Sequence, residues 1–208
     1  MTVPGTFDTS ARELIHAGLQ NLDEARSLFR QLSASGFDAA RCGLLLDALQ
    51  HVCDPDVALR NLVDIVNAQV SQGRALDDIM PDDTAFRQLV AVLGVSDAMG
   101  KLMRFRPDLV QAAATDHCNS HLYNHDQRRA HVLESVGADP NDRMSPTATM
   151  DLADAATALR RTYRNQLAAI IAQDTMSDDP IALQPRISSE LSDLADAALE
   201  GALAIARH

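Results

Sequence analysis

The sequence predicts an all-α protein, a bundle of about eight to ten helices with no sheet. Of its 208 residues 46% are hydrophobic but only 3% are aromatic, and Trp is absent from the sequence. The apolar residues are mostly Ala, Leu, Val and Ile, and Ala and Leu are the strongest helix formers. They recur at helical spacing, whereas no alternating apolar and polar run of strand length appears. A chain of this length buries roughly 70% of its unfolded surface, so it can form a core without disulfides or metal.

The first 72 residues are expected to form four short helices packed as hairpins. A capping side chain stands before each apolar run, and two of these caps have a Glu three positions later, which is the pattern of a capping box. The caps are Ser10 with Glu13, Asn21 with Glu24, Asp38, and Asp54 followed by Pro55. They predict helices over residues 11–19, 22–32, 39–52 and 55–70.

Helix signals continue after a break at residues 80–83. These residues cap a helix over 84–94, which Gly94 is expected to end in the C′ position. Ser96 caps the next helix, over 97–105. Pro107 stops that helix and starts another that runs to residue 114. We expect the break to separate an N-terminal helical subdomain, residues 1–80, from a second helical segment, residues 81–208.

The rest of the chain predicts two longer helices. A polar helical segment over 117–137 is followed by the loop 138–146, and a long helix is expected from about Thr147 to Gln173. A second loop, containing Pro180 and Pro185, leads into a terminal helix over 189–208. Apolar residues keep helical spacing up to Ala206, and no Gly or Pro ends the helix. We therefore expect further polypeptide to follow His208 in the complete protein, and an exposed apolar face on this helix that favours dimerisation.

Composition narrows the class of partners and the compartment. The net charge is −11, from 18 basic and 29 acidic residues, so a nucleic acid is not expected as a partner. The start of the chain lacks the features of a signal peptide, and no run approaches the roughly 18 apolar residues of a membrane span. The three cysteines, Cys42, Cys53 and Cys118, form no CxxC pair, and Cys42 and Cys53 are expected to be reduced, buried thiols. These features predict a soluble, cytoplasmic protein without membrane association.

One histidine cluster has the spacing of a metal site. His117, His121 and His125 follow each other at i, i+4 and i+8, with Cys118 beside them, and two His one turn apart can share a zinc ion. The segment lacks an HExxH motif and is polar on all sides, as a solvated helix or loop would be. A solvated segment and a zinc site both remain open, and we assign no metal ligand.

Charged helix faces give the remaining candidates. Arg160 and Arg164 share a face and could hold a phosphate or carboxylate, or pair with acids such as Asp154. Acidic residues at helical spacing could hold a divalent cation or form a solvated face; they are Asp151 with Asp154, and Asp193 with Asp196 and Glu200.

Motifs that mark common active sites are absent from the sequence. It has no GxxxxGK[ST] or GxGxxG loop for phosphates and no GxSxG nucleophile motif. We therefore predict no catalytic and no cofactor-binding residue in this chain.

Four stretches, in this order, resemble the region upstream of the first catalytic domain in the glutamine synthetase adenylyltransferase family of bacterial enzymes. They are "DPDVALRNLVDIV", "FRQLVAVLGVSDAMGKLMRFRPDLV", "ALRRTYRNQLAAIIAQD" and "ELSDLADAALEGAL", within residues 54–206. The resemblance implies an N-terminal part of an enzyme that transfers AMP from ATP to a tyrosine of glutamine synthetase, releasing pyrophosphate. It also implies removal of that AMP by orthophosphate, which gives ADP.

The same resemblance implies Mg²⁺ and ATP as cofactors of the whole enzyme, and glutamine synthetase and the PII signalling protein as its partners. The family's paired-Asp motif, Ser-Asp-x-Asp, is missing from this chain, so the resemblance implies a helical scaffold that packs on a catalytic domain and is inactive alone. Two alternatives are a stand-alone helical protein-interaction module and a small zinc-binding regulator.

Overall fold

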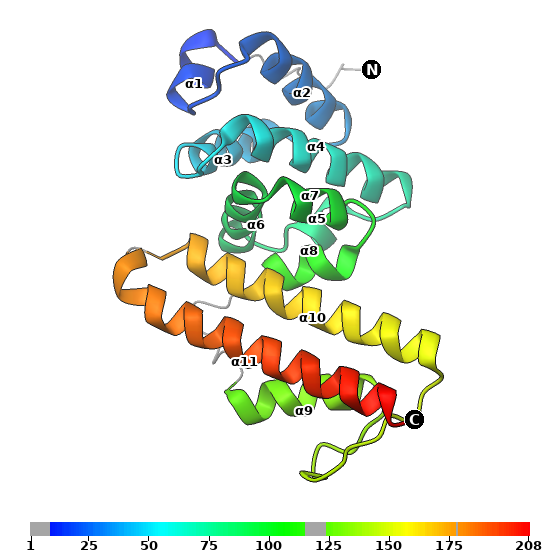
Figure 1. Cartoon of the computed structure of the whole chain (residues 1–208). Coiled ribbons are helices and arrows are strands. Elements are labelled where there is room, and N and C mark those ends of the chain that lie inside the picture. The colour runs from blue at the N-terminus through cyan, green and yellow to red at the C-terminus, as the bar shows by residue number, and fades with distance from the viewer. Residues whose placement is uncertain (1–8, 115–123, 178) are drawn as a thin grey trace. The chain divides into compact units, whose positions relative to one another are not determined.

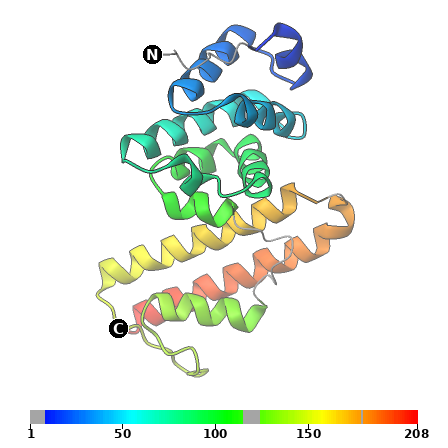
Figure 2. The same ribbon diagram turned by 180° about the vertical axis from the view of Figure 1, so that it is seen from behind.

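The computed structural model describes residues 9–114, 124–177 and 179–208, apart from the side chains of Asp78 and Ile79. Every regular element in these ranges is a helix, as Figures 1 and 2 show from two sides, so the predicted all-α class is confirmed. The chain divides into two compact units, Met1–Thr115 and Asp116–His208.

The first unit contains helices α1 to α8. Their bounds are α1 Ala11–His16, α2 Leu22–Ala34, α3 Ala39–Leu49, α4 Pro55–Ser71, α5 Leu76–Ile79, α6 Asp83–Val95, α7 Asp97–Met103 and α8 Pro107–Ala114. Each predicted cap forms: side chains of Ser10, Asn21, Asp38, Asp54 and Ser96 accept hydrogen bonds from backbone N–H groups of the following helix. Helix α4 packs against α2, α6 and α7, and the buried Leu59, Leu62 and Ile65 form its inner face.

Four helices end in a glycine-dependent motif. After α9, Gly137 has φ +75°, its N–H donates to the carbonyl of Glu134, and Ala138 N–H donates to the carbonyl of Leu133. This is the Schellman motif, which satisfies carbonyls that the helix end leaves without partners and places the glycine in the left-handed region. Gly18, Gly36 and Gly73 end α1, α2 and α4 in the same way.

Gly94 does not have the predicted C′ role. It lies inside α6, which continues to Val95, and it is buried. A Cβ at Gly94 would lie 2.8 Å from the Cβ of Val52, so the glycine allows α6 to approach the turn that follows α3. The prediction failed because spacing along one helix does not reveal a close neighbour from another segment.

Gly100 makes a similar close approach between α7 and α4. A Cβ there would lie 2.4 Å from Cγ of Asn61. The Asn61 side chain is buried and donates to the carbonyl of Leu93 at 3.3 Å, near the C-terminal end of α6. Gly100 therefore makes room for a buried amide that satisfies a helix-end carbonyl.

The described residues of the second unit form a bundle of three helices, α9 His125–Ser135, α10 Leu152–Thr175 and α11 Pro180–Ala206. In Figure 1 α10 and α11 form an antiparallel hairpin, and α9 packs against both. One core cluster contains Leu133, Val136, Ala155 and Ala204, and a second contains Ile170, Ile187 and Leu194. Gly201 brings α11 close to α9, because its Cβ would lie 2.8 Å from Val132.

Two predicted boundaries in this unit were wrong. Helix α10 starts at Leu152, not near Thr147, and Pro180 and Pro185 lie within α11, not in a loop. Pro180 is the first helical residue, where a missing N–H costs nothing, and Asp179 caps the helix through Ala182 N–H at 3.0 Å. Pro185 removes one bond to the carbonyl of Ile181, whose side chain is exposed, so water can reach that end of the helix.

The loop between α9 and α10 supports the end of α11. Ala148 N–H donates to the carbonyl of Ala204 at 2.9 Å, and Arg207 donates to the carbonyl of Pro146 at 3.1 Å. The sequence shows no cap for this helix, but the fold supplies one from a segment about 60 residues earlier.

The compact units do not follow the expected boundary at residue 80. Helices α4 and α6, which lie on either side of it, pack against each other inside the first unit. Leu59 of α4 and Leu89 of α6 are both fully buried. The break at residues 80–83 therefore does not separate two hydrophobic cores.

Candidate functional site

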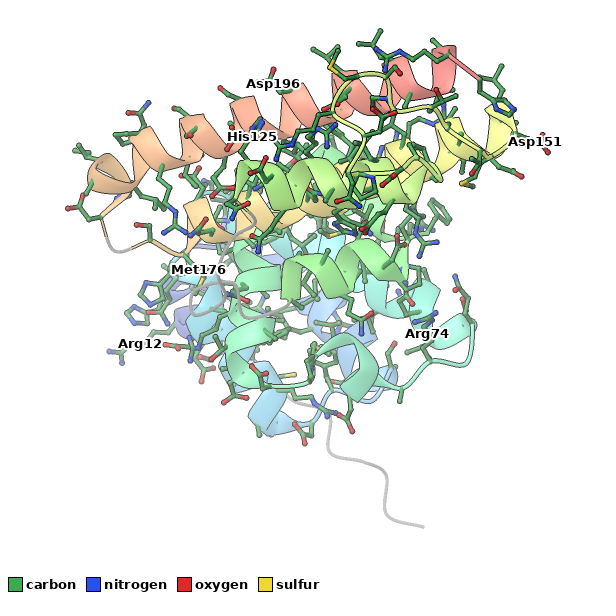
Figure 3. All side chains as sticks on the ribbon, turned by 90° about the horizontal axis from the view of Figure 1, so that it is seen from below. Arg12, Arg74, His125, Asp151, Met176 and Asp196 are labelled. Atoms are coloured by element: carbon green, nitrogen blue, oxygen red, sulfur yellow. The ribbon has the colours of Figure 1, made fainter. Side chains whose placement is uncertain are left out.

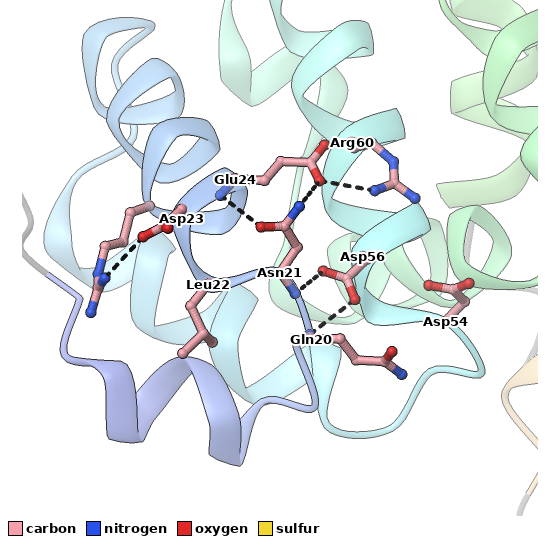
Figure 4. Close-up of a pocket in the computed structure, with 9 residues that line it drawn as sticks. Gln20, Asn21, Leu22, Asp23, Glu24, Asp54, Asp56 and Arg60 are labelled. Atoms are coloured by element: carbon pink, nitrogen blue, oxygen red, sulfur yellow. Dashed lines mark hydrogen bonds and ion pairs between the residues drawn. The ribbon is translucent and has the colours of Figure 1, made fainter.

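An open pocket of about 750 Å³ lies in the first unit, where the start of α2 meets the start of α4 (Figure 4). Its lining carries four carboxylates and two guanidinium groups. The lining residues are Gln20, Asn21, Leu22, Asp23, Glu24, Arg26, Asp54, Asp56 and Arg60. The excess of negative charge would favour a cationic group over a phosphate.

The carboxylates of this pocket are already used by the fold. Asp56 accepts hydrogen bonds from the backbone N–H groups of Gln20 at 3.0 Å and Asn21 at 3.4 Å. Glu24 accepts from the amide of Asn21 at 2.9 Å and from Arg60 at 3.3 Å. Asp56 thus takes the N–H of Asn21 that a capping box would give to Glu24, so only half of the predicted box forms. These bonds indicate a structural junction between two helix starts, where carboxylates are also favoured by the helix dipoles.

The predicted histidine cluster lies mostly outside the described residues. His117, His121 and Cys118 are not described, and His125 is the first residue of α9 (Figure 3). The Nδ1 atom of His125 lies 3.2 Å from a carboxylate oxygen of Asp193 on α11. Among the residues that the structure describes, no group of three or more His, Cys, Asp or Glu side chains could hold a metal ion. The zinc hypothesis remains a prediction.

Cys42 and Cys53 differ in their exposure to solvent. Cys42 is buried in α3, as expected, and burial raises the pKa of its thiol above the ordinary value of 9.0. Cys53 is exposed in the turn before α4, so the prediction of a buried thiol was wrong there. The helical pattern of 39–52 suggested burial, but the helix ends at Leu49.

Among the described residues the most buried charged side chain is that of Arg128 in α9, within the segment predicted to be polar. Its side chain is 1% exposed, donates to Gln166 of α10 at 2.7 Å and forms an ion pair with Glu190 of α11. Arg128 therefore joins α9, α10 and α11. One signal was available: Arg128 stands one turn before the buried Val132, on the same helix face.

Arg129 holds the loop between α9 and α10. It forms two hydrogen bonds with the carboxylate of Glu200 on α11, at 2.6 and 2.7 Å. It also donates to the carbonyls of Pro140 at 2.6 Å and Asp142 at 2.9 Å. Glu200 therefore pairs with Arg129, and not with the divalent cation that its spacing with Asp193 and Asp196 could suggest.

The other candidates remain on the surface. Asp151 and Asp196, labelled in Figure 3, are exposed, as is Asp154. The side chain of Asp151 makes no capping bond to α10. Arg160 donates to the hydroxyl of Thr157 at 3.2 Å. In the described part of the chain, the hydrogen bonds of Asp56, Arg129 and Arg128 support a helix start, a loop and the bundle interior. No helix in that part is long and apolar enough to cross a membrane.

These features define an all-helical protein whose buried polar groups organise its helices. Three comparisons with known proteins extend this description. A "Bifunctional glutamine synthetase adenylyltransferase/adenylyl-removing enzyme" of Bifidobacterium longum (strain DJO10A) is 65% identical over 202 residues, which is 97% of this chain. Proteins of the same name from Leifsonia xyli subsp. xyli and Streptomyces avermitilis are 31% and 30% identical over 93% and 100% of this chain. No family model and no solved structure matches.

The chain is therefore related, over nearly its whole length, to one segment of the bifunctional glutamine synthetase adenylyltransferase/adenylyl-removing enzymes. It spans about one fifth of the length of these curated relatives, 18–19% in the three cases. The resemblance predicted from residues 54–206 is confirmed. It also extends into the first fifty residues, which lie outside the four resembling stretches.

Proposed function

We propose that this chain is a helical segment of an enzyme that adenylylates and deadenylylates a tyrosine of glutamine synthetase, and so regulates nitrogen assimilation. The observation that carries the proposal is 65% identity over 97% of the chain to a relative of that name. Because related chains with this level of identity share a fold, the same helices belong in the longer enzyme.

Within that enzyme we assign this segment a scaffolding role and not a chemical one. The contacts of Arg128 and Arg129 support this assignment, because these side chains hold the three helices and the loop of the second unit in place. A rigid helical segment of this kind positions a catalytic domain or a large protein substrate. Glutamine synthetase and the PII signalling protein are the partners that we propose for the whole enzyme.

Mg²⁺ and ATP are proposed cofactors of the whole enzyme. The described residues do not fit them, since they include no group of metal-ligating side chains and the pocket at the start of α2 is acidic. We derive no chemical step in this chain, and assign the nucleotide to the remainder of the longer polypeptide.

The proposal is tested by comparing two proteins. A longer version, continued from His208 through the downstream reading frame, is expected to release ADP from adenylylated glutamine synthetase and orthophosphate. The 208-residue chain alone is expected to release none. The matched control is the longer protein with both Asp residues of its Ser-Asp-x-Asp motif changed to Asn. A downstream frame without that motif, or a longer protein without activity, would refute the proposal.

A stand-alone interaction module is the second candidate. The exposed leucines of α11, described below, are the surface that such a module would use, although their area is small for a separate partner. This candidate predicts a stop codon directly after the codon for His208, so the gene sequence separates the two.

A further inference from the structure

Among the described residues of the second unit, the outer side of α11 is an apolar face that no other helix covers. Leu191, Leu199 and Leu203 are 43%, 65% and 54% exposed. The opposite side of the same helix, including Leu194, is buried against α9 and α10. We call the exposed set, Leu191, Ala195, Leu199, Ala202, Leu203 and Ala206, the α11 outer face. In this fully described stretch Asp196 is the only ionisable residue among the exposed positions (Figure 3).

The spacing of these residues fits another helix. Ala195, Leu199, Ala202 and Ala206 follow each other at intervals of four, three and four residues, which is the seam by which one helix packs on another. Alanines between leucines allow the two backbones to approach closely. The face is therefore suited to a helix with an apolar stripe of its own.

The size of the face decides between a separate and a covalently attached partner. Sixteen residues of helix extend about 24 Å, and a helix is about 10 Å wide, so the face offers about 240 Å². Stable interfaces between separate proteins bury about 800 Å² on each partner, and association also costs translational and rotational freedom. A segment of the same polypeptide acts at a millimolar effective concentration, so it can bind through a smaller buried area.

We propose that the α11 outer face is covered by a helix from the part of the longer polypeptide that lies outside this chain. The inference rests on the proposed function, under which such polypeptide exists. The length of the longer polypeptide supports this choice of occupant, since the curated relatives are about five times as long as the segment that matches this chain. A second copy of this chain is disfavoured by the small area of the face.

Thiol labelling tests the inference in two proteins. A Leu199→Cys variant is prepared in this chain and in the longer protein, and labelling is followed by peptide-resolved mass spectrometry, with the exposed Cys53 as internal reference. In this chain Cys at position 199 should react at a rate close to that of Cys53. In the longer protein it should react at least tenfold more slowly.

A second variant keeps the test independent of labelling. Leu199→Glu should leave the melting temperature of this chain unchanged, because the side chain is exposed, but should lower that of the longer protein. Fast labelling in a longer protein that still releases ADP would overturn the inference and leave the proposed function intact. Slow labelling in this chain, or a dimer of this chain that Leu199→Glu dissociates, would also overturn it. A gene without downstream coding sequence would refute both.

Discussion

Replacing Gly100 by Ala should destabilise the first unit through its contact with Asn61. The new Cβ would lie 2.4 Å from Cγ of Asn61, so the buried amide must move away from the carbonyl of Leu93. Overpacking costs about 2 kcal/mol and the lost hydrogen bond about 1 kcal/mol, whereas Ala gains about 1 kcal/mol over Gly in a helix. The expected net loss is about 2 kcal/mol, or a melting temperature lower by roughly 10 °C for a unit of this size.

Gly43 provides a matched control in α3. A Cβ there meets no atom within 4 Å, so Gly43→Ala gains helix propensity without a clash and should raise the melting temperature by about 2–5 °C. Thermal unfolding followed by far-UV circular dichroism and calorimetry measures both variants.

A double-mutant cycle isolates the contact. In an Asn61→Ala background the clash is absent, so Gly100→Ala should be neutral or stabilising there. If Gly100→Ala stabilises the natural chain as Gly43→Ala does, or destabilises equally in both backgrounds, the packing argument is refuted.

Three further predictions concern charge and thiol chemistry. Glu190→Ala should destabilise the protein by about 3–5 kcal/mol because it leaves the buried guanidinium of Arg128 without its carboxylate. Adding Arg128→Met should recover most of that loss. Equal melting temperatures of the single and double variants would contradict this prediction. Backbone N–H groups of Ser145 and Met144 hold the pKa of Asp142 below its ordinary value of 3.8, so its contribution to loop stability is complete above pH 3.8 and is lost as pH falls through the lower, folded-state pKa. The protection factors of the loop amides, measured as a function of pH, report this contribution. Asp142→Asn should remove the pH dependence of these protection factors. Iodoacetamide should label Cys53 rapidly and Cys42 only on unfolding, as mass spectrometry would show; comparable native rates would mean that Cys42 is accessible.

The capped helix starts of the first unit were predictable because their information is local, whereas the starts of α10 and α11 were not. Ser10, Asp38, Asp54 and Ser96 each bond to an N–H three residues later, so the sequence contains both partners within one turn. Helix ends and loops were less predictable. Gly94 resembles a C′ glycine when α6 is considered alone, and only its contact with Val52 explains the residue.

The candidate site was harder to predict than the fold. The Asn21 and Asp54 caps were recognised separately, but nothing in the sequence indicates that the two helix starts meet around Asp56. The burial of Arg128 could not be predicted, because its partners, Gln166 and Glu190, are 38 and 62 residues away in the sequence. Pairing over such distances depends on how the three helices pack.

The sequence by itself determined the all-α class, the capped helix starts of the first unit and the resemblance to the adenylyltransferases, because short-range hydrogen bonding, apolar periodicity and matching motifs are all properties of the linear chain. The tertiary structure alone decided which polar residues are buried, how α11 is capped by Ala148, and which of its sides stays exposed around Leu199. These outcomes depend on contacts between residues far apart in the sequence, and such contacts exist only once the helices have packed.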